Sequence, residues 1–210
     1  MNNFNLSIQH IVFDVGNVLV RWDPAGIVEQ VFANDHPSAT ALANLTQQIF
    51  KSEIWMDLNR GKFTERDAIQ LYHGTLGIDI SRLEIMMQTV KASLTPIGGS
   101  FDLLHKLHQA NYPLYALTDN TKEIMAYLKK KYDFWRLFKG IVVSAEFGVL
   151  KPSAEIYQHL LTSYHLIPEQ TVFIDDLLQN VEGARKLKMH AIQFENAKKC
   201  FEELQQLHVK

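Results

Sequence analysis

Cysteine is almost absent from this chain, which has Cys200 as its only one among 210 residues. A single cysteine excludes an internal disulfide and leaves no set of thiolates that could hold zinc. Neither sign of charge is in excess, because the formal net charge is −2. The chain therefore lacks the strong basic field that would bind nucleic acid or an anionic membrane, and we expect a protein of the reducing cytoplasm.

Long apolar runs are also missing, since no stretch of about 18 apolar residues could cross a bilayer. The N-terminal segment MNNFNLSIQH lacks the basic start and apolar stretch of a signal peptide. We therefore expect no membrane partner. Hydrophobic residues make up 47% and charged residues 21%, which is typical of a globular protein with one good core. We expect a monomer, and a dimer through an apolar surface is the alternative.

Short apolar runs rich in β-branched residues alternate with helical patterns over much of the chain. The expected strands are 11–13, 114–117, 141–143, 171–174 and 191–194. Between them, apolar spacings of three and four predict helices at about 100–110, 121–132, 153–165 and 178–188. This alternation predicts an α/β fold, a Rossmann-like, doubly wound parallel sheet with helices on both faces.

The segment from about 24 to 93 breaks this alternation, because it has helical patterns separated by turn signals and no convincing strand. It follows the first expected strand directly, so it is expected above the carboxyl edge of the sheet. We therefore expect a core made of 1–20 and 94–210, with 21–93 forming an inserted helical cap.

Polar side chains follow the expected strands at the edge where parallel sheets bind their ligands. These residues are Asp14 with Gly16, Thr118 with Asp119, Lys151, and the pair Asp175 and Asp176. Clustered carboxylates repel one another by several kcal/mol at about 4 Å and need a counter-charge. Mg²⁺ suits them because it prefers hard oxygen ligands and keeps places for water and phosphate.

These residues together resemble the four motifs of haloacid dehalogenase-like hydrolases, and the resemblance spans about residues 10 to 195. The phrases Phe-Asp-Val-Gly-Asn-Val and Leu-Lys-Pro-x-x-x-Ile-Tyr are similar to the sugar-phosphate phosphatase branch. The resemblance implies a cap of the helical class and a set of roles. By this resemblance Asp14 is the nucleophile and a metal ligand, Gly16 offers its carbonyl to Mg²⁺, and Asp176 binds the metal directly. Thr118 and Lys151 hold phosphate, with Asp119 beside them. Asp175 acts through water or orients Lys151.

The function expected from these residues is Mg²⁺-dependent hydrolysis of a small phosphate monoester through an aspartyl-phosphate. A sugar phosphate is the first candidate, by resemblance only. Aromatic and charged residues of the expected cap could select the substrate, namely Trp22, Trp55, Asp57 and Arg60. The histidines form no convincing cluster, so metal binding is not expected of them.

One position departs from the family pattern, because Gly16 stands where phosphatases of this superfamily usually carry a second aspartate as general acid. A positioned acid is worth about 10² to 10⁴ in rate, so its loss favours esters with good leaving groups or an acid from elsewhere. Asp23 and Asp119 are candidates for that acid. The favoured reading of each is as a helix N-cap.

Three alternative functions share these residues. A haloacid dehalogenase needs no metal and has no use for Asp175 and Asp176 beside a carboxylate substrate. A phosphotransferase would also need the missing acid. A non-catalytic binding module would keep the site for recognition alone.

Overall fold

The computed structural model describes residues 7–35 and 38–210, so residues 1–6 of the expected core and 36–37 of the expected cap lie outside the described residues. Five parallel strands form one sheet in the order β3-β2-β1-β4-β5. They are β1 (His10–Phe13), β2 (Leu114–Thr118), β3 (Phe138–Val143), β4 (Thr171–Asp175) and β5 (His190–Gln193). The chain winds outward from β1 to β3 and then returns to β4 on the other side. This is the expected doubly wound, Rossmann-like fold.

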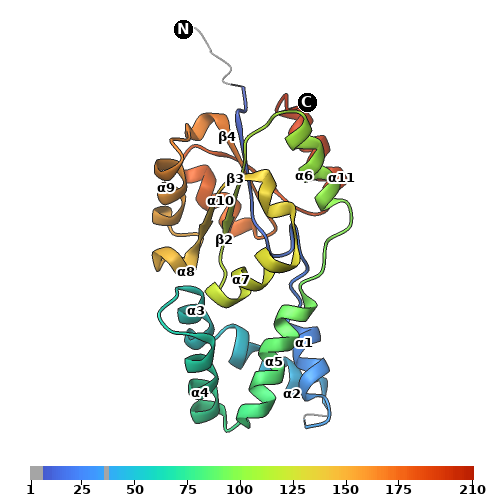
Figure 1. Ribbon diagram of the computed structural model, residues 1–210, viewed down its shortest axis with the longest axis vertical. Helices are drawn as coiled ribbons and strands as arrows, with labels where there is room; N and C mark the ends of the chain where they lie inside the picture. The colour runs from blue at the N-terminus through green and yellow to red at the C-terminus, as the bar shows by residue number, and fades with distance from the viewer. Residues whose placement is uncertain (1–6, 36–37) are drawn as a thin grey trace.

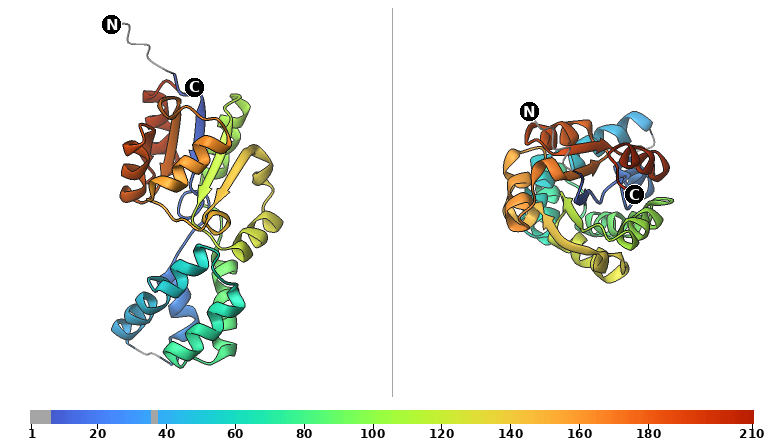
Figure 2. Two further views of the ribbon diagram at one scale, coloured as in Figure 1. Left: turned by 90° about the vertical axis from the view of Figure 1, so that its left-hand side faces the viewer. Right: turned by 90° about the horizontal axis from the view of Figure 1, so that it is seen from above.

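Helices cover both faces of the sheet, as Figures 1 and 2 show. They are α6 (Ser100–Gln109), α7 (Lys122–Lys131), α8 (Ser144–Phe147), α9 (Ala154–Ser163), α10 (Leu178–Lys186) and α11 (Ala197–Gln206), with short 3₁₀ turns η1 (Phe134–Leu137) and η2 (Pro168–Gln170). Alternate residues of a strand point to opposite faces. Ile11 and Phe13 accordingly pack into one buried layer and Val12 into the other.

Five helices lie between β1 and α6, at the carboxyl end of the sheet (Figure 1). They are α1 (Pro24–Phe32), α2 (Ala39–Phe50), α3 (Glu53–Asn59), α4 (Glu65–Leu76) and α5 (Ile80–Ser93), which we call the helical insert. The described residues of this segment contain no strand, as expected. Two of its helices begin at clear N-caps: for α1, Asp23 accepts from Gly26 N at 3.0 Å, and for α4, Thr64 forms a capping box with Asp67.

The helical insert is joined to the sheet by two chain segments that lie side by side, since Arg21 N donates to Thr95 O at 2.8 Å. A further contact lies at α8. The Ser144 hydroxyl donates to Asn59 O at 2.7 Å, and Gly61 (φ 70°) leaves no room for a Cβ against Ala145 O. Only glycine fits such a close approach in the left-handed region. The position of the insert above the strand ends is therefore fixed by specific contacts.

No helix in residues 7–35 and 38–210 is long and apolar enough to span a membrane.

Candidate active site

Asp14 stands at the carboxyl end of the central strand, and its backbone N–H donates to Ile174 O at 2.8 Å. Its side chain is 10% exposed. The chain turns sharply after it, and the left-handed residue of that turn is Asn17 (φ 52°) and not Gly16. Asparagine tolerates this conformation better than most residues. The left-handed conformation that this turn needs therefore falls on Asn17.

Asn17 also joins the two halves of the site. Its side-chain amide donates to Asp176 Oδ2 at 3.2 Å, and its Oδ1 accepts from Trp22 N at 2.9 Å. One side chain thus fixes a carboxylate on the β4 side and the start of the helical insert.

Lys151 lies at the centre of the charged cluster, with its side chain 2% exposed. Its ammonium contacts Asp14 Oδ1 at 2.8 Å, Asp175 Oδ2 at 2.7 Å and Leu117 O at 3.3 Å. Burial alone would lower the pKa of Lys151, but the charges of Asp14 and Asp175 outweigh it and raise the pKa. The ammonium is therefore a fixed positive charge beside Asp14.

Asp175 is fully buried and is held from two sides. Oδ1 accepts from Leu177 N at 2.9 Å and from the Asn180 amide at 3.0 Å, while Oδ2 faces Lys151. Of the two roles expected for Asp175, the geometry supports the orientation of Lys151. Leu177 is the N-cap residue of α10, so Asp175 and Asp176 are not simple helix caps.

Asp119 holds the loop that carries Lys151, because its two carboxylate oxygens accept from Lys151 N at 3.1 Å each. The N-cap of α7 is Thr121, whose side chain accepts from Ile124 N, so the expectation that Asp119 caps this helix is wrong. Burial raises the pKa of Asp119 to about 6. Thr118 is 1% exposed, and its hydroxyl accepts from the Asn120 amide at 3.3 Å.

Three carboxylates, those of Asp14, Asp175 and Asp176, each offer an oxygen within 4.8 Å of one another. One ammonium cannot balance three carboxylates, so the ionised cluster carries an excess of two negative charges. Burial raises the pKa of Asp14 to about 8, and burial followed by the charge of Asp175 raises the pKa of Asp176. Hard oxygen donors with this charge excess fit a divalent cation such as Mg²⁺.

The raised pKa of Asp14 gives a testable dependence of stability on pH and Mg²⁺. Folding raises this pKa from 3.8 to about 8, so without metal the folded protein gains stability from the proton at low pH and loses it as the pH rises through 8. We expect Mg²⁺ to replace the proton. At about 100 times its Kd it should raise Tm by roughly 5–10 °C at pH 8.5, and by clearly less at pH 5.5.

Thermal unfolding at both pH values, with Mg²⁺ or with EDTA, measures this effect. Asp14→Asn is the control, because it removes the Asp14 carboxyl and should reduce the pH dependence of the Mg²⁺ shift to the part that comes from Asp176. A shift of equal size at both pH values would contradict the assignment.

A cavity of about 550 Å³ opens between the strand ends and the helical insert. Asp14, Asp119, Lys151 and Asp176 line it, whereas Gly16, Thr118 and Asp175 are not among its lining residues. Trp22 and Trp55, expected as selectivity residues, also line it, together with Phe50. The other two expected selectivity residues pair with each other outside the lining, at 2.7 Å from Arg60 Nη1 to Asp57 Oδ1.

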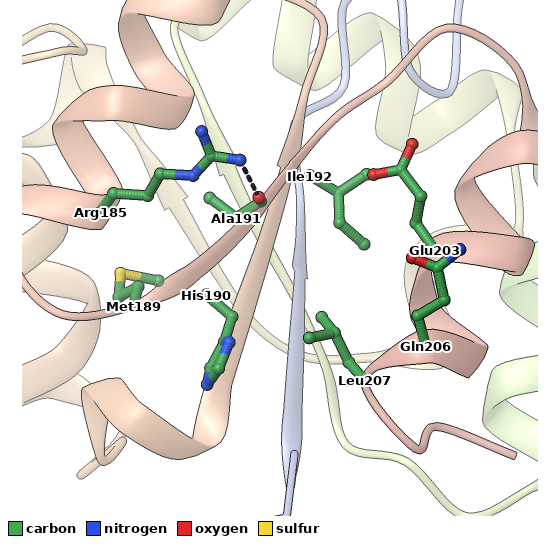
Figure 3. Close-up of a pocket in the computed structure, with 8 residues that line it drawn as sticks. All are labelled: Arg185, Met189, His190, Ala191, Ile192, Glu203, Gln206 and Leu207. Atoms are coloured by element: carbon green, nitrogen blue, oxygen red, sulfur yellow. Dashed lines mark hydrogen bonds between the residues drawn. The ribbon is translucent and has the colours of Figure 1, made fainter.

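A second hollow, of about 320 Å³, lies between α10, β5 and α11 (Figure 3). Arg185 points to the backbone of β5 there and donates to Ala191 O at 2.8 Å. Glu203 is the one carboxylate among its lining residues, so this hollow lacks the clustered carboxylates of the first cavity. The chemistry belongs to the cavity at the strand ends.

Three asparagines of the site were not predicted from the sequence: Asn17, Asn120 and Asn180. Asn180 had a detectable signal, since it is a polar residue on the buried face of a helix five positions after Asp175. Asn17 and Asn120 stand beside predicted site residues. The Asn17 side chain reaches Asp176 on a distant segment, whereas Asn120 bonds through its side chain to nearby Thr118 and through its backbone N–H to the distant Ser144.

The parallel sheet, with clustered carboxylates and a buried lysine at its carboxyl edge, defines a Rossmann-like α/β protein with a charged site at the strand ends. The chain belongs to the haloacid dehalogenase-like hydrolase family, whose model matches residues 26–194.

Two known phosphatases are similar over nearly the whole chain. A sesquiterpene phosphatase of Aspergillus oryzae is 28% identical over 196 residues, which cover 93% of this chain and 94% of that protein. A D-ribitol-5-phosphate phosphatase of Bacteroides thetaiotaomicron is 25% identical over 211 residues, covering 94% and 97%. The structure resembles a Bacteroides thetaiotaomicron enzyme of the same family in complex with magnesium and inorganic phosphate, with a TM-score of 0.72, 19% identity and coverage of 90% and 95%.

Proposed function

We propose that this protein is a Mg²⁺-dependent phosphatase that hydrolyses a small phosphate monoester through an aspartyl-phosphate on Asp14. The observation that carries the proposal is the meeting of Asp14, Lys151 and Asp176 at one cavity, with Lys151 Nζ 2.8 Å from Asp14 Oδ1. The phosphatase names of the two similar proteins support the same reaction. The two names give different alcohols, so they do not identify the alcohol part of this protein's substrate. The sugar-phosphate class stays a prediction.

In the first step an oxygen of Asp14 forms a bond to phosphorus while the bond from phosphorus to the ester oxygen breaks. The departing alkoxide takes a proton from water. Lys151 stabilises the negative charge on the phosphoryl oxygens because it is buried and already oriented by Asp175. Thr118 is proposed to donate its hydroxyl to one of those oxygens, with Asp119 holding the lysine loop in place.

In the second step water attacks phosphorus and releases inorganic phosphate, which restores the Asp14 carboxylate. The groups proposed to hold Mg²⁺ are the Asp14 and Asp176 carboxylates and the Gly16 carbonyl. Asp175 belongs to the same carboxylate cluster and orients Lys151. The bound ion supplies positive charge to the phosphate and balances the carboxylates. We further propose that residues 21–93 act as the cap that closes over this cavity.

The absence of an acid at Gly16 gives a prediction that can be tested by replacement. A Cβ at this position would meet only Trp22 Cβ, at 3.9 Å, so a larger side chain fits. Asp23 caps α1 and Asp119 is bound to the Lys151 backbone, so neither is free as a donor. We expect Gly16→Asp to raise kcat for alkyl phosphates by about 10-fold or more, and to change acetyl phosphate much less.

The measurement is kcat for both classes of ester across pH 5 to 9. Gly16→Asn is the matched control, because it has the same size and cannot supply the proton. Equal rates for the two variants on alkyl phosphates would show that proton donation is not what Gly16 lacks.

The proposed function is tested directly with p-nitrophenyl phosphate and acetyl phosphate, in Mg²⁺ or in EDTA. Mg²⁺-dependent turnover supports it. Metal-independent release of halide from chloroacetate would instead support a dehalogenase, and inactivity in both assays would favour a binding module.

A further inference from the structure

We infer that the alcohol part of the substrate is apolar, so that the site takes phosphate monoesters of hydrocarbon or aromatic alcohols in preference to those of sugars and polyols. The inference rests on the proposed phosphatase function and names the substrate class of the same site. It follows from how the cavity is lined around the reacting carboxylate.

The apolar wall begins beside the nucleophile loop. Trp22 lines the cavity and follows Asp14 by eight positions, and its backbone N–H is bound by Asn17 at 2.9 Å. Its Cβ lies 3.9 Å from where a Cβ of Gly16 would stand. The indole of Trp22 and the carboxylate of Asp14 therefore face the same cavity, so an alcohol attached to phosphorus at Asp14 shares that space with Trp22.

Trp22 is one member of a packed aromatic cluster with Phe50 and Trp55. The two indole rings are stacked at 5.6 Å, and Phe50 stands edge-on to both at 5.3 and 4.8 Å. Phe50 is 4% and Trp55 7% exposed, so packing fixes both rings before any ligand arrives. A preorganised apolar wall binds hydrocarbon with little loss of side-chain entropy. Leu94, Ile124 and Leu150 extend the apolar lining.

The buried polar lining residues offer few donors to a polyol, because each asparagine of the cavity already donates its side-chain amide to another residue, although Asn180 Oδ1 is buried without a partner. Four asparagines of the cavity donate a side-chain N–H within the protein. Asn17 donates to Asp176, Asn59 to Trp55 O, Asn120 to Thr118 and Asn180 to Asp175. Outside these and the charged cluster, the polar lining is Lys51, Glu53 and Gln179, all exposed. A polyol would regain fewer hydrogen-bond partners at this wall than it has in water, which costs free energy at each hydroxyl left without one.

The cavity mouth carries a further apolar group next to the proposed metal ligand Asp176. Leu177 lines the cavity, yet its side chain remains 48% exposed. Packing within the protein does not account for a large apolar side chain in this position. An apolar alcohol that passes the mouth would cover it.

Two esters with the same five-carbon chain test the inference: pentyl phosphate and D-ribitol 5-phosphate. Both release a primary alcohol, so the difference lies chiefly in their hydroxyl groups. We expect kcat/KM with Mg²⁺ to be about tenfold or more higher for pentyl phosphate. From propyl to pentyl phosphate it should rise by about threefold to fourfold for each methylene buried.

Acetyl phosphate separates this inference from the proposed function, because it reports the chemical step without a large alcohol. If acetyl phosphate is hydrolysed and ribitol 5-phosphate equals or exceeds pentyl phosphate, the inference is overturned and the phosphatase stands. If no ester is hydrolysed, the proposed function fails and the inference falls with it.

Leu177→Gln tests the wall in the protein itself, and its neighbour Leu178→Gln is the matched control. Leu178 is 49% exposed and does not line the cavity. We expect Leu177→Gln to lower the ratio of kcat/KM for pentyl phosphate over ribitol 5-phosphate about threefold, and Leu178→Gln to leave that ratio unchanged. An equal effect of both variants on this ratio would contradict the proposal that Leu177 helps to select apolar alcohols.

Discussion

Replacing Asp14 with asparagine is expected to lower kcat for p-nitrophenyl phosphate by about 10⁴-fold or more. The reason is chemical, because the amide oxygen of asparagine cannot form the phosphoryl ester that the proposed mechanism needs. The fold should survive. Lys151 keeps its 2.7 Å contact with Asp175, and one of three mutually repelling carboxylates is removed.

Two measurements separate lost chemistry from lost structure in Asp14→Asn. Thermal unfolding in EDTA at pH 8.5 should give a Tm no lower than that of the wild-type protein. The kinetic assay should show the loss at saturating substrate, and not in KM alone. A variant that retains a tenth or more of the wild-type kcat would rule out Asp14 as the nucleophile.

Replacing Lys151 with methionine is expected to damage both stability and turnover. Lys151 Nζ is buried between Asp14 and Asp175, and its loss leaves the fully buried Asp175 without a counter-charge. Removing one partner of a buried ion pair typically costs about 3–5 kcal/mol. The lost stabilisation of phosphoryl charge should lower kcat by about 10²–10³-fold.

Urea unfolding at pH 8 in EDTA measures the first effect, and p-nitrophenyl phosphate turnover the second. Lys198→Met is the control, because Lys198 lies 88% exposed, with Nζ 4.0 Å from Glu202, and its loss should change stability by about 0.5 kcal/mol or less. If the two lysine variants were equally stable, Lys151 would not hold the carboxylate cluster together.

The strands were predictable because their apolar runs are short and are followed by polar residues. The structure confirms all five, with a change of boundary in each: β1, β2 and β4 are one residue longer than predicted, β3 begins at Phe138 and not at 141, and β5 covers His190–Gln193 and not 191–194. The largest change is at β3, an outer strand whose first two residues, Phe138 and Lys139, are not buried. The fold followed from the alternation of strands and helices, which is a local pattern.

The predicted site residues meet because parallel strands end at a common edge, a rule that needs no knowledge of side-chain partners. What could not be predicted are the hydrogen bonds that orient them. The contacts of Asn17 with Asp176 and of Asp119 with the Lys151 backbone join residues 159 and 32 positions apart. The misassigned cap at Asp119 has the same origin. A local pattern made it a helix N-cap, and a long-range contact overrode the pattern.

The packing of the aromatic cluster could not be predicted from the sequence either. Trp22 and Trp55 were visible as candidates, but nothing in their spacing indicated that they stack with Phe50 beside the nucleophile. That arrangement comes from the packing of α2 and α3 against the entry to the helical insert. The proposed preference for apolar alcohols therefore rests on the structure and not on the sequence pattern.

A crystal structure grown with Mg²⁺ and beryllium fluoride, a mimic of the phosphoryl group, tests the central claim most directly. The account predicts one metal ion bound by Asp14 and Asp176, with the fluoride group attached to the Asp14 carboxylate and Lys151 beside it. An ion and a fluoride group bound away from Asp14 would contradict it.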